Sequence, residues 1–147
     1  MFQLSVFVVA VVGIGWLIGA TNLPGAWYAG LAKPGFVPPN WAFPVAWTIL
    51  YIMIAVAGWR TFRRDPTGRA MLVWAVQLAL NFAWSPVMFT MHQIGFALVI
   101  LIGLFAAIVT YITTETSRDR LAAALFVPYA AWVAFAGVLN AAIWRLN

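Results

Sequence analysis

Residues 70–114, AMLVWAVQLALNFAWSPVMFTMHQIGFALVILIGLFAAIVTYITT, decide the fold of this chain. The stretch contains no lysine, arginine, aspartate or glutamate. As one α-helix it would be about 68 Å long at 1.5 Å per residue, roughly twice the hydrocarbon thickness of a membrane. It must therefore fold back on itself. The polar break at Met91–Gln93 predicts a turn between two transmembrane helices, 70–90 and 94–114.

The rest of the chain has the same character. It is 65% hydrophobic and only 7% charged, whereas charged residues make up roughly a quarter of a soluble domain. Three more charge-free blocks are present: 1–32, 34–59 and 121–144. Because a helix needs about 20 apolar residues to cross a membrane, these blocks predict three further spans, over 4–20, 43–59 and 121–144. The expected fold is all-α, a single-domain integral membrane bundle of five transmembrane helices, with a proline-rich lid loop at 21–42.

The N-terminal residues predict whether the first span is retained, and the distribution of positive charge predicts the topology. Met1-Phe2-Gln3 lacks the positive region of a cleaved signal peptide, so 4–20 is expected to remain as a helix, with cleavage after Ala20 as the alternative. Four of the eight Lys/Arg residues lie between Arg60 and Arg69. The positive-inside rule then places the N-terminus in the cytoplasm and the first loop outside it. Helical spans favour a bacterial inner membrane, because outer-membrane spans are normally closed barrels.

Composition and spacing exclude several kinds of chemistry. The chain has no cysteine, and therefore no disulfide, thiol nucleophile or thiolate metal site. Its basic residues form no continuous face, so nucleic acid is not an expected partner. The acids Asp65, Glu115 and Asp119 are expected in loops on one side of the membrane and His92 in a turn on the other, too far apart for acid–base catalysis. His92 is interpreted as a solvated turn residue rather than a haem or metal ligand. No catalytic residue, metal site or required cofactor is predicted.

The third span has two contrasting faces. Gln77, Asn81, Trp84 and Met88 fall on one helical face, and polar side chains within a membrane usually face the bundle interior. The opposite face carries small residues four apart, which permit close approach of another helix and predict a homodimer face: Ala75, Ala79 and Ala83. Two alternatives remain open. The alanines can pack within the same chain, and the polar pair can bond to neighbouring helices without any ligand.

The second and fifth spans add large aromatic side chains. Trp47 and Tyr51 are four residues apart on one span, and Trp132, Ala136 and Asn140 share a face of the other. A cavity between such faces would have flat apolar walls and few hydrogen-bonding groups, which suits a planar, mostly apolar ligand. Stripes of this kind are more often plain packing between helices, so the residues alone leave both interpretations open.

Three separate segments resemble a known family. They are Trp27–Tyr51 (WYAGLAKPGFVPPNWAFPVAWTILY), Asn81–Phe89 (NFAWSPVMF) and Phe126–Trp132 (FVPYAAW). Their motifs resemble those of the tryptophan-rich sensory protein family, TspO/MBR, whose animal members are the translocator protein or peripheral benzodiazepine receptor. The resemblance runs from about residue 26 to the end of the chain, and three motifs in the same order are not expected by chance.

The resemblance implies a five-helix bundle, commonly dimeric, whose ligand cavity is capped by the first loop. Members of the family bind tetrapyrroles such as protoporphyrin IX and benzodiazepine-type ligands, and the animal members bind cholesterol. Carried over by position, the implied ligand-binding residues are Tyr28, Phe36, Trp47, Tyr51, Asn81, Trp84, Trp132 and Ala136.

Two positions depart from the family pattern. The lid commonly reads Lys-Pro-x-Trp-x-Pro-Pro, and Phe36 stands here in place of the tryptophan. A phenyl ring keeps the flat wall but has no N–H group to donate. The proposed sterol motif needs a tyrosine between Leu/Val and Lys/Arg, and residues Val138–Arg145 contain none. No sterol site is predicted.

The leading hypothesis is a membrane sensor or regulator that binds porphyrins in an aromatic pocket within the bundle. An enzyme that degrades bound porphyrin with light or oxygen is one alternative, with the indole rings as relays. Transport of tetrapyrroles is another, although transporters tend to show internal repeats, broken helices and buried ionisable groups. None of these features is visible in the sequence.

Overall fold

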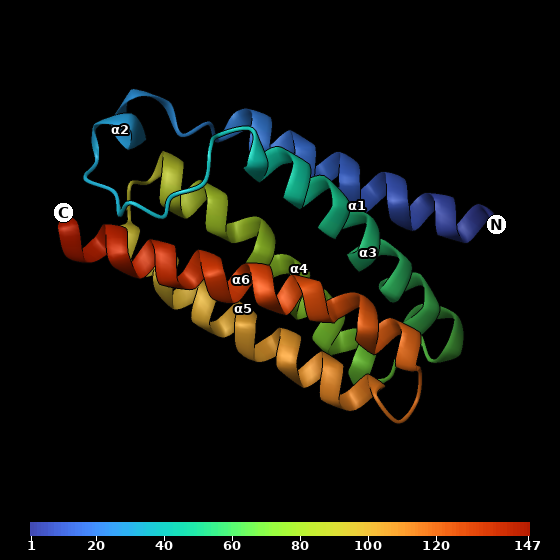
Figure 1. Cartoon of the computed structure of the whole chain (residues 1–147). Coiled ribbons are helices and arrows are strands. Elements are labelled where there is room, and N and C mark those ends of the chain that lie inside the picture. The colour runs from blue at the N-terminus through green and yellow to red at the C-terminus, as the bar shows by residue number, and fades with distance from the viewer.

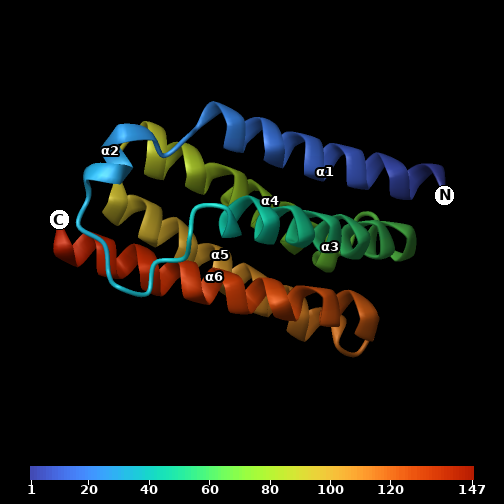
Figure 2. The ribbon, with the colours of Figure 1, turned by 45° about the horizontal axis from the view of Figure 1, so that its top comes forward.

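A computed structural model describes all residues, 1–147, and contains helices and loops but no strands. Five long helices run side by side (Figures 1 and 2): α1 (Phe2–Thr21), α3 (Ala42–Arg64), α4 (Arg69–Ser85), α5 (Ile94–Glu115) and α6 (Arg120–Leu146). A short helix, α2 (Gly25–Gly30), lies in the first loop, and a π-helical turn, η1 (Pro86–Thr90), extends α4. Five helical segments, counting α4 with η1, are long and apolar enough to cross a membrane. The predicted fold class is confirmed.

The helices extend beyond the expected spans at several ends. The largest difference is in α3, which continues to Arg64 instead of ending near Trp59. The charged end of this helix is stabilised because Arg60 pairs with Asp119, the residue before α6, and Arg64 pairs with Glu115, the last residue of α5. The start of α6 is fixed by a cap, since Asp119 accepts hydrogen bonds from the backbone N–H groups of Leu121 and Ala122, both at 3.1 Å.

The sequence pattern predicts one span over 70–90, but in the structure this span is an α-helix followed by a π-helical turn. Its last turn, η1, closes with a wider backbone hydrogen bond, from the N–H of Met91 to the carbonyl of Pro86 at 2.9 Å. Pro86 has no N–H and its ring crowds the preceding turn, which disrupts regular α-helical bonding at this point. The widened turn carries Val87 and Met88 into the core and places Phe89 beside the lid.

The helices do not surround a uniformly filled core. α5 packs closely against α4 and α6, while α1 packs mainly against α3 and makes few contacts with α4. In Figure 1, α1 lies along the edge of the bundle, and only Val11 and Gly15 of this helix are buried. The lid loop and the C-terminus lie at one end of the bundle, and the N-terminus lies at the other (Figure 1). The loose contact between α1 and α4 leaves room beneath the lid.

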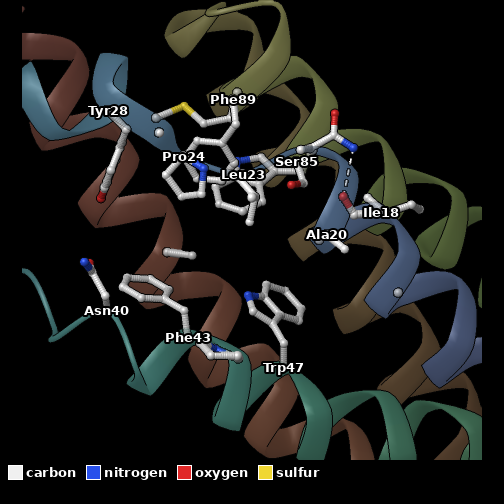
Figure 3. Close-up of a pocket in the computed structure, with 18 of the residues that line it drawn as sticks. Ile18, Ala20, Leu23, Pro24, Tyr28, Asn40, Phe43, Trp47, Ser85 and Phe89 are labelled. Atoms are coloured by element: carbon white, nitrogen blue, oxygen red, sulfur yellow. Dashed lines mark hydrogen bonds between the residues drawn. The ribbon is translucent and has the colours of Figure 1, made fainter.

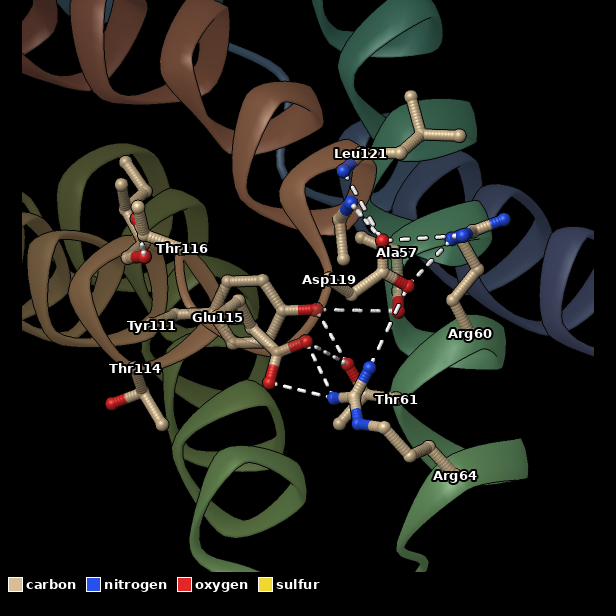
Figure 4. Close-up of polar contacts among 12 residues, drawn as sticks. Ala57, Arg60, Thr61, Arg64, Tyr111, Thr114, Glu115, Thr116, Asp119 and Leu121 are labelled. Atoms are coloured by element: carbon tan, nitrogen blue, oxygen red, sulfur yellow. Dashed lines mark hydrogen bonds and ion pairs between the residues drawn. The ribbon is translucent and has the colours of Figure 1, made fainter.

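One expectation about charge is wrong. Glu115 was expected in a loop, but it is the last residue of α5 and its side chain is fully buried. It accepts hydrogen bonds from Arg64 Nη2 at 2.5 and 2.7 Å and from Thr61 Oγ1 at 3.4 Å (Figure 4). The pairing neutralises a carboxylate that could not otherwise be buried. Sequence patterning could not reveal it, because the two partners are 51 residues apart.

Candidate ligand-binding site

A cavity of about 970 Å³ lies beneath the lid, between α1, α3, α4, η1 and α6. Its size is at the upper end of the range for small-molecule sites, roughly 300–1,000 Å³. Figure 3 shows Phe43 and Trp47 of α3 facing Leu23 and Phe89 across the open space. The lining is mostly apolar, and Lys33 is its single charged residue. This is the kind of space that the aromatic stripes of the sequence suggested.

The wall contributed by α3 consists of stacked rings. Trp47 and Tyr51 are one helical turn apart, and their ring centroids lie 5.6 Å apart at an interplanar angle of 28°. Both line the cavity, as the resemblance implied. Another flat ring system can pack against these rings in the same manner.

The α4 wall is held by a chain of buried hydrogen bonds. The Tyr51 hydroxyl donates to Asn81 Oδ1 at 3.3 Å, and Asn81 Nδ2 donates to the Tyr129 hydroxyl at 2.6 Å. Tyr129 in turn donates to Gln77 Oε1 at 2.8 Å. In these three hydrogen bonds Asn81 accepts through Oδ1 and donates through Nδ2. The Asn81 carboxamide is therefore fixed in orientation at the cavity wall. These bonds also satisfy Oε1 of Gln77, which is completely buried, whereas Nε2 of Gln77 has no hydrogen-bond partner.

A second polar link joins α4 to α6. Trp84 Nε1 donates to Asn140 Oδ1 at 3.2 Å, and Asn140 Nδ2 donates to the carbonyl of Ile94 at 2.9 Å. Trp84 and Asn140 both line the cavity, together with Ala136 one turn earlier on α6. The indole N–H of Trp84, which needs a partner at this depth, is satisfied within the protein. Its ring remains available to a ligand.

Two of the expected ligand-binding residues do not line the cavity: Phe36 and Trp132. Trp132 stands behind the α3 wall, perpendicular to Trp47 with centroids 6.4 Å apart, and its buried Nε1 has no hydrogen-bond partner. Phe36 is 50% exposed and contacts Phe135 edge-on at 6.3 Å. Trp132 therefore supports the wall from outside, and Phe36 lies on the outer surface of the lid.

The lid is tied to the rest of the protein at several points. Tyr28 lines the cavity and meets Phe89 edge-on at 5.4 Å, and partial burial raises the pKa of the Tyr28 phenol. Lys33 Nζ lies 4.8 Å from the centroid of the Tyr28 ring. Beyond the cavity, Trp27 stacks on His92 at 4.1 Å and 12°. His92 is predicted from the sequence to be a solvated turn residue; it is exposed, and its backbone φ of 57° is typical of a tight turn.

Comparison with known proteins assigns the family. The TspO/MBR family model matches residues 5–145. The chain belongs to this family. Protein CrtK of Rhodobacter capsulatus is 40% identical over 133 residues, 88% of this chain and 83% of that protein. The tryptophan-rich sensory protein of Cereibacter sphaeroides is 37% identical over 129 residues, covering 88% and 82%. The human translocator protein is 34% identical over 142 residues, covering 91% and 84%. The resemblance stated from the sequence motifs is confirmed.

Membership of the TspO/MBR family, with five apolar spans, establishes a multi-pass integral membrane protein. It also supports a role in ligand binding or sensing at the membrane. The size and the mostly apolar lining of the cavity suit a small organic ligand.

In this TspO/MBR-family chain, α1 contributes residues to the site that the sequence did not indicate. Gly15, Trp16 and Gly19 line the cavity. Trp16 Nε1 donates to Thr48 Oγ1 on α3 at 3.2 Å, which links the first helix to the aromatic wall. The polar residues Gln3, Ser5 and Thr21 lie near the two ends of α1, and the stretch between them is apolar on every side, so no polar residue there marks an inward face. The spacing Gly15-x-x-x-Gly19 was the only available signal.

The predicted dimer face of this TspO/MBR-family chain points largely outward. Ala75 and Ala79 are exposed on α4, whereas Ala83 is half-buried and packs against core residues beneath the lid. The exposed side chains of Leu72 and Val76 lie on the same helix. An outward apolar surface with two small residues is suited to lipid or to a second helix, and the homodimer remains a prediction.

Proposed function

We propose that this protein is a membrane sensor or regulator that binds a flat, mostly apolar ligand in the cavity beneath the lid. The proposed ligands are a tetrapyrrole such as protoporphyrin IX and benzodiazepine-type compounds. The observation that carries the proposal is the cavity itself: about 970 Å³, walled by Trp47, Tyr51 and Trp84 and lined mainly by apolar atoms. Burial of ring faces against these walls supplies most of the affinity.

The few polar groups of the cavity suit the edge of such a ligand. Lys33 Nζ already donates to the carbonyls of Ala29 and Leu31, at 3.2 and 3.0 Å, and therefore lies fixed at the lid. Protoporphyrin IX carries two carboxylates on one edge of an otherwise apolar ring. A ligand that enters with this edge toward the lid places a carboxylate near Lys33 while its apolar edge reaches Tyr51 and Asn81.

The experiment is a titration of the detergent-solubilised protein with protoporphyrin IX, followed by quenching of tryptophan fluorescence. We expect saturable quenching, reduced in amplitude by Trp47→Phe because this indole lines the cavity. Trp144→Phe is the matched control, since Trp144 is 56% exposed and lies outside the cavity lining. Lys33→Met should weaken binding about fivefold, as expected for one partly solvated charge contact. Equal quenching and equal affinity in all three variants would contradict the proposed site.

A further inference from the structure

A second, smaller pocket lies at the opposite end of the bundle from the lid. It has a volume of about 370 Å³ and is lined by Trp59, Arg60, Arg63, Arg64, Arg118 and Asp119. No residue of this lining belongs to the ligand cavity. The pocket lies between the end of α3 and the turn that joins α5 to α6, and Figure 4 shows the polar contacts around it. We call it the arginine pocket.

The carboxylate that lines the arginine pocket, Asp119, and the carboxylate beside it, Glu115, are already paired. Arg60 Nε lies 2.8 Å from Asp119 Oδ2, and Arg64 lies 2.5 Å from Glu115 Oε2 and 3.5 Å from Asp119 Oδ2. These pairs join α3 to the α5–α6 turn. Neither Arg63 nor Arg118 has an acidic partner within ion-pair distance. The pocket therefore contains two more arginines than the carboxylates can neutralise, and it attracts anions.

Asp119 remains charged at neutral pH. Partial burial acts to raise the pKa of Asp119, but the hydrogen bonds from Arg60 and from the N–H of Ala122, with the nearby guanidinium charges, hold it below its usual range. The excess positive charge of the pocket is therefore present with the Asp119 carboxylate already ionised.

The surroundings of the pocket match the level of lipid headgroups. Trp59 lies near the end of a membrane span, where tryptophan is enriched, and the Arg63 guanidinium lies 5.2 Å from the centroid of its ring. Ile52 is seven residues earlier on α3, so it lies about two turns deeper on the same side. It is 44% exposed. A lipid with its phosphate in the pocket would have an apolar helix surface for its acyl chains.

We propose that the arginine pocket binds the phosphate headgroup of an anionic phospholipid. Arg63 and Arg118 supply the free guanidinium groups, which bind phosphate oxygens in a bidentate manner. Arg60 and Arg64 shape the pocket while they remain paired with their acids. Basic pockets at the ends of transmembrane helices are suited to such headgroups. The positive-inside rule depends only on how many positive charges lie on one side of the membrane, and does not require them to form a pocket. Here Arg63 and Arg118 have no acidic partner and lie in one pocket with the half-buried Trp59.

The test is native mass spectrometry of the purified protein titrated with phosphatidylglycerol or with phosphatidylcholine. We expect preferential binding of phosphatidylglycerol. The double variant Arg63→Gln/Arg118→Gln should weaken it about thirtyfold, the expected effect of two charges at a membrane surface. Arg69→Gln/Arg120→Gln is the matched control. It removes the same charge from the same end of the bundle, at residues that do not line the pocket.

Each outcome decides the proposal. Equal weakening in the two double variants would show a general surface attraction and overturn the site. Displacement of the lipid by inorganic phosphate at equal phosphate concentration would also overturn it, because the site would then serve a free anion. If the glutamine variant fails to fold, Arg63→Lys/Arg118→Lys carries the test. It keeps both charges but loses bidentate geometry, so we expect at least about threefold weaker binding, and unchanged affinity would contradict the proposal.

Discussion

The aromatic ring of Tyr51 lies against the backbone of Gly15, in the space that a β-carbon at residue 15 would occupy. Glycine lets α1 approach α3 closely at this level of the membrane. The Tyr51 hydroxyl also donates to Asn81 on α4 at 3.3 Å. The ring is thus held between the first helix and the hydrogen-bonded α4 wall. Gly15 fixes the position of a cavity wall without presenting a side chain of its own.

Gly15→Ala should therefore alter the cavity. The added methyl group overlaps the Tyr51 ring and either displaces it toward the cavity or separates α1 from α3, with an overpacking penalty of about 1–3 kcal/mol. We expect roughly tenfold weaker binding of protoporphyrin IX, measured by fluorescence quenching. Gly19→Ala is the control, because Gly19 also lines the cavity and its β-carbon would meet nothing within 4 Å. Unchanged affinity in Gly15→Ala would show that the Tyr51 position does not matter.

Tyr129→Phe tests whether the buried hydrogen bonds around Asn81 affect ligand binding beyond their effect on stability. The variant removes the acceptor of Asn81 and the donor to Gln77, and a buried polar group left unpaired costs about 1–3 kcal/mol. We expect a lower melting temperature and weaker porphyrin binding, because the Asn81 carboxamide loses its fixed orientation. Tyr111→Phe is the control. Its hydroxyl contacts Thr61 and the carbonyl of Ala57 at the other end of the bundle, so it should lower stability only. Equal loss of affinity in both variants would contradict the network's role.

Sequence patterning predicted those parts of the site that polar or aromatic spacing marks on a helix. Asn81 and Trp84 on α4, and Trp47 and Tyr51 on α3, are each separated by a spacing that places them on one face, and all four line the cavity. Patterning assigned Trp132 to the cavity as well, but a helical face is broad, and its ring lies behind Trp47. Whether Trp132 lines the cavity or lies behind Trp47 depends on the rotation of α6 about its axis, which the spacing of residues in the sequence does not determine.

Other features depend on contacts between segments far apart in the chain. The pairing of Arg64 with Glu115 requires two helix ends to meet, and the contribution of Gly15 depends on the ring that fills its empty side. The π-helical turn after Ser85 is a local consequence of Pro86. Proline in a membrane helix is compatible with several local geometries, so its sequence position alone did not predict this one.

Stability should fall in acid in part through Asp119. Its pKa is lowered in the folded state, so its contribution is fully present above the unfolded value of about 3.9 and is lost as the pH falls through the folded value. Asp119→Asn retains an N-cap side chain but not the charge. We expect the variant to be less stable near pH 7, with a smaller further loss between about pH 5 and pH 2 than the wild type. Parallel stability curves over that range, measured by thermal unfolding in detergent, would contradict the assignment.

The exposed small residues of α4 should mediate a homodimer. We propose that Ala75 and Ala79 permit close contact with a second copy of the chain, because both are exposed on the outer face of the helix. Ala75→Leu/Ala79→Leu should weaken dimerisation at least about tenfold, measured by light scattering in detergent. Ala106→Leu, on the exposed face of α5, is the control and should have no effect. If the wild-type protein is monomeric in detergent, the proposed homodimer is contradicted.

The most direct test of the cavity as a ligand site is to fill it. Ala136 lies in its α6 wall, and Ala136→Leu places three additional carbon atoms in the space assigned to the ligand. The matched control is Ala106→Leu, which adds the same atoms on the outer surface of α5. In protoporphyrin IX titrations we predict at least tenfold weaker binding for Ala136→Leu and wild-type affinity for the control. Wild-type affinity in both variants, with both proteins folded, would show that the porphyrin binds elsewhere and would contradict the proposed function.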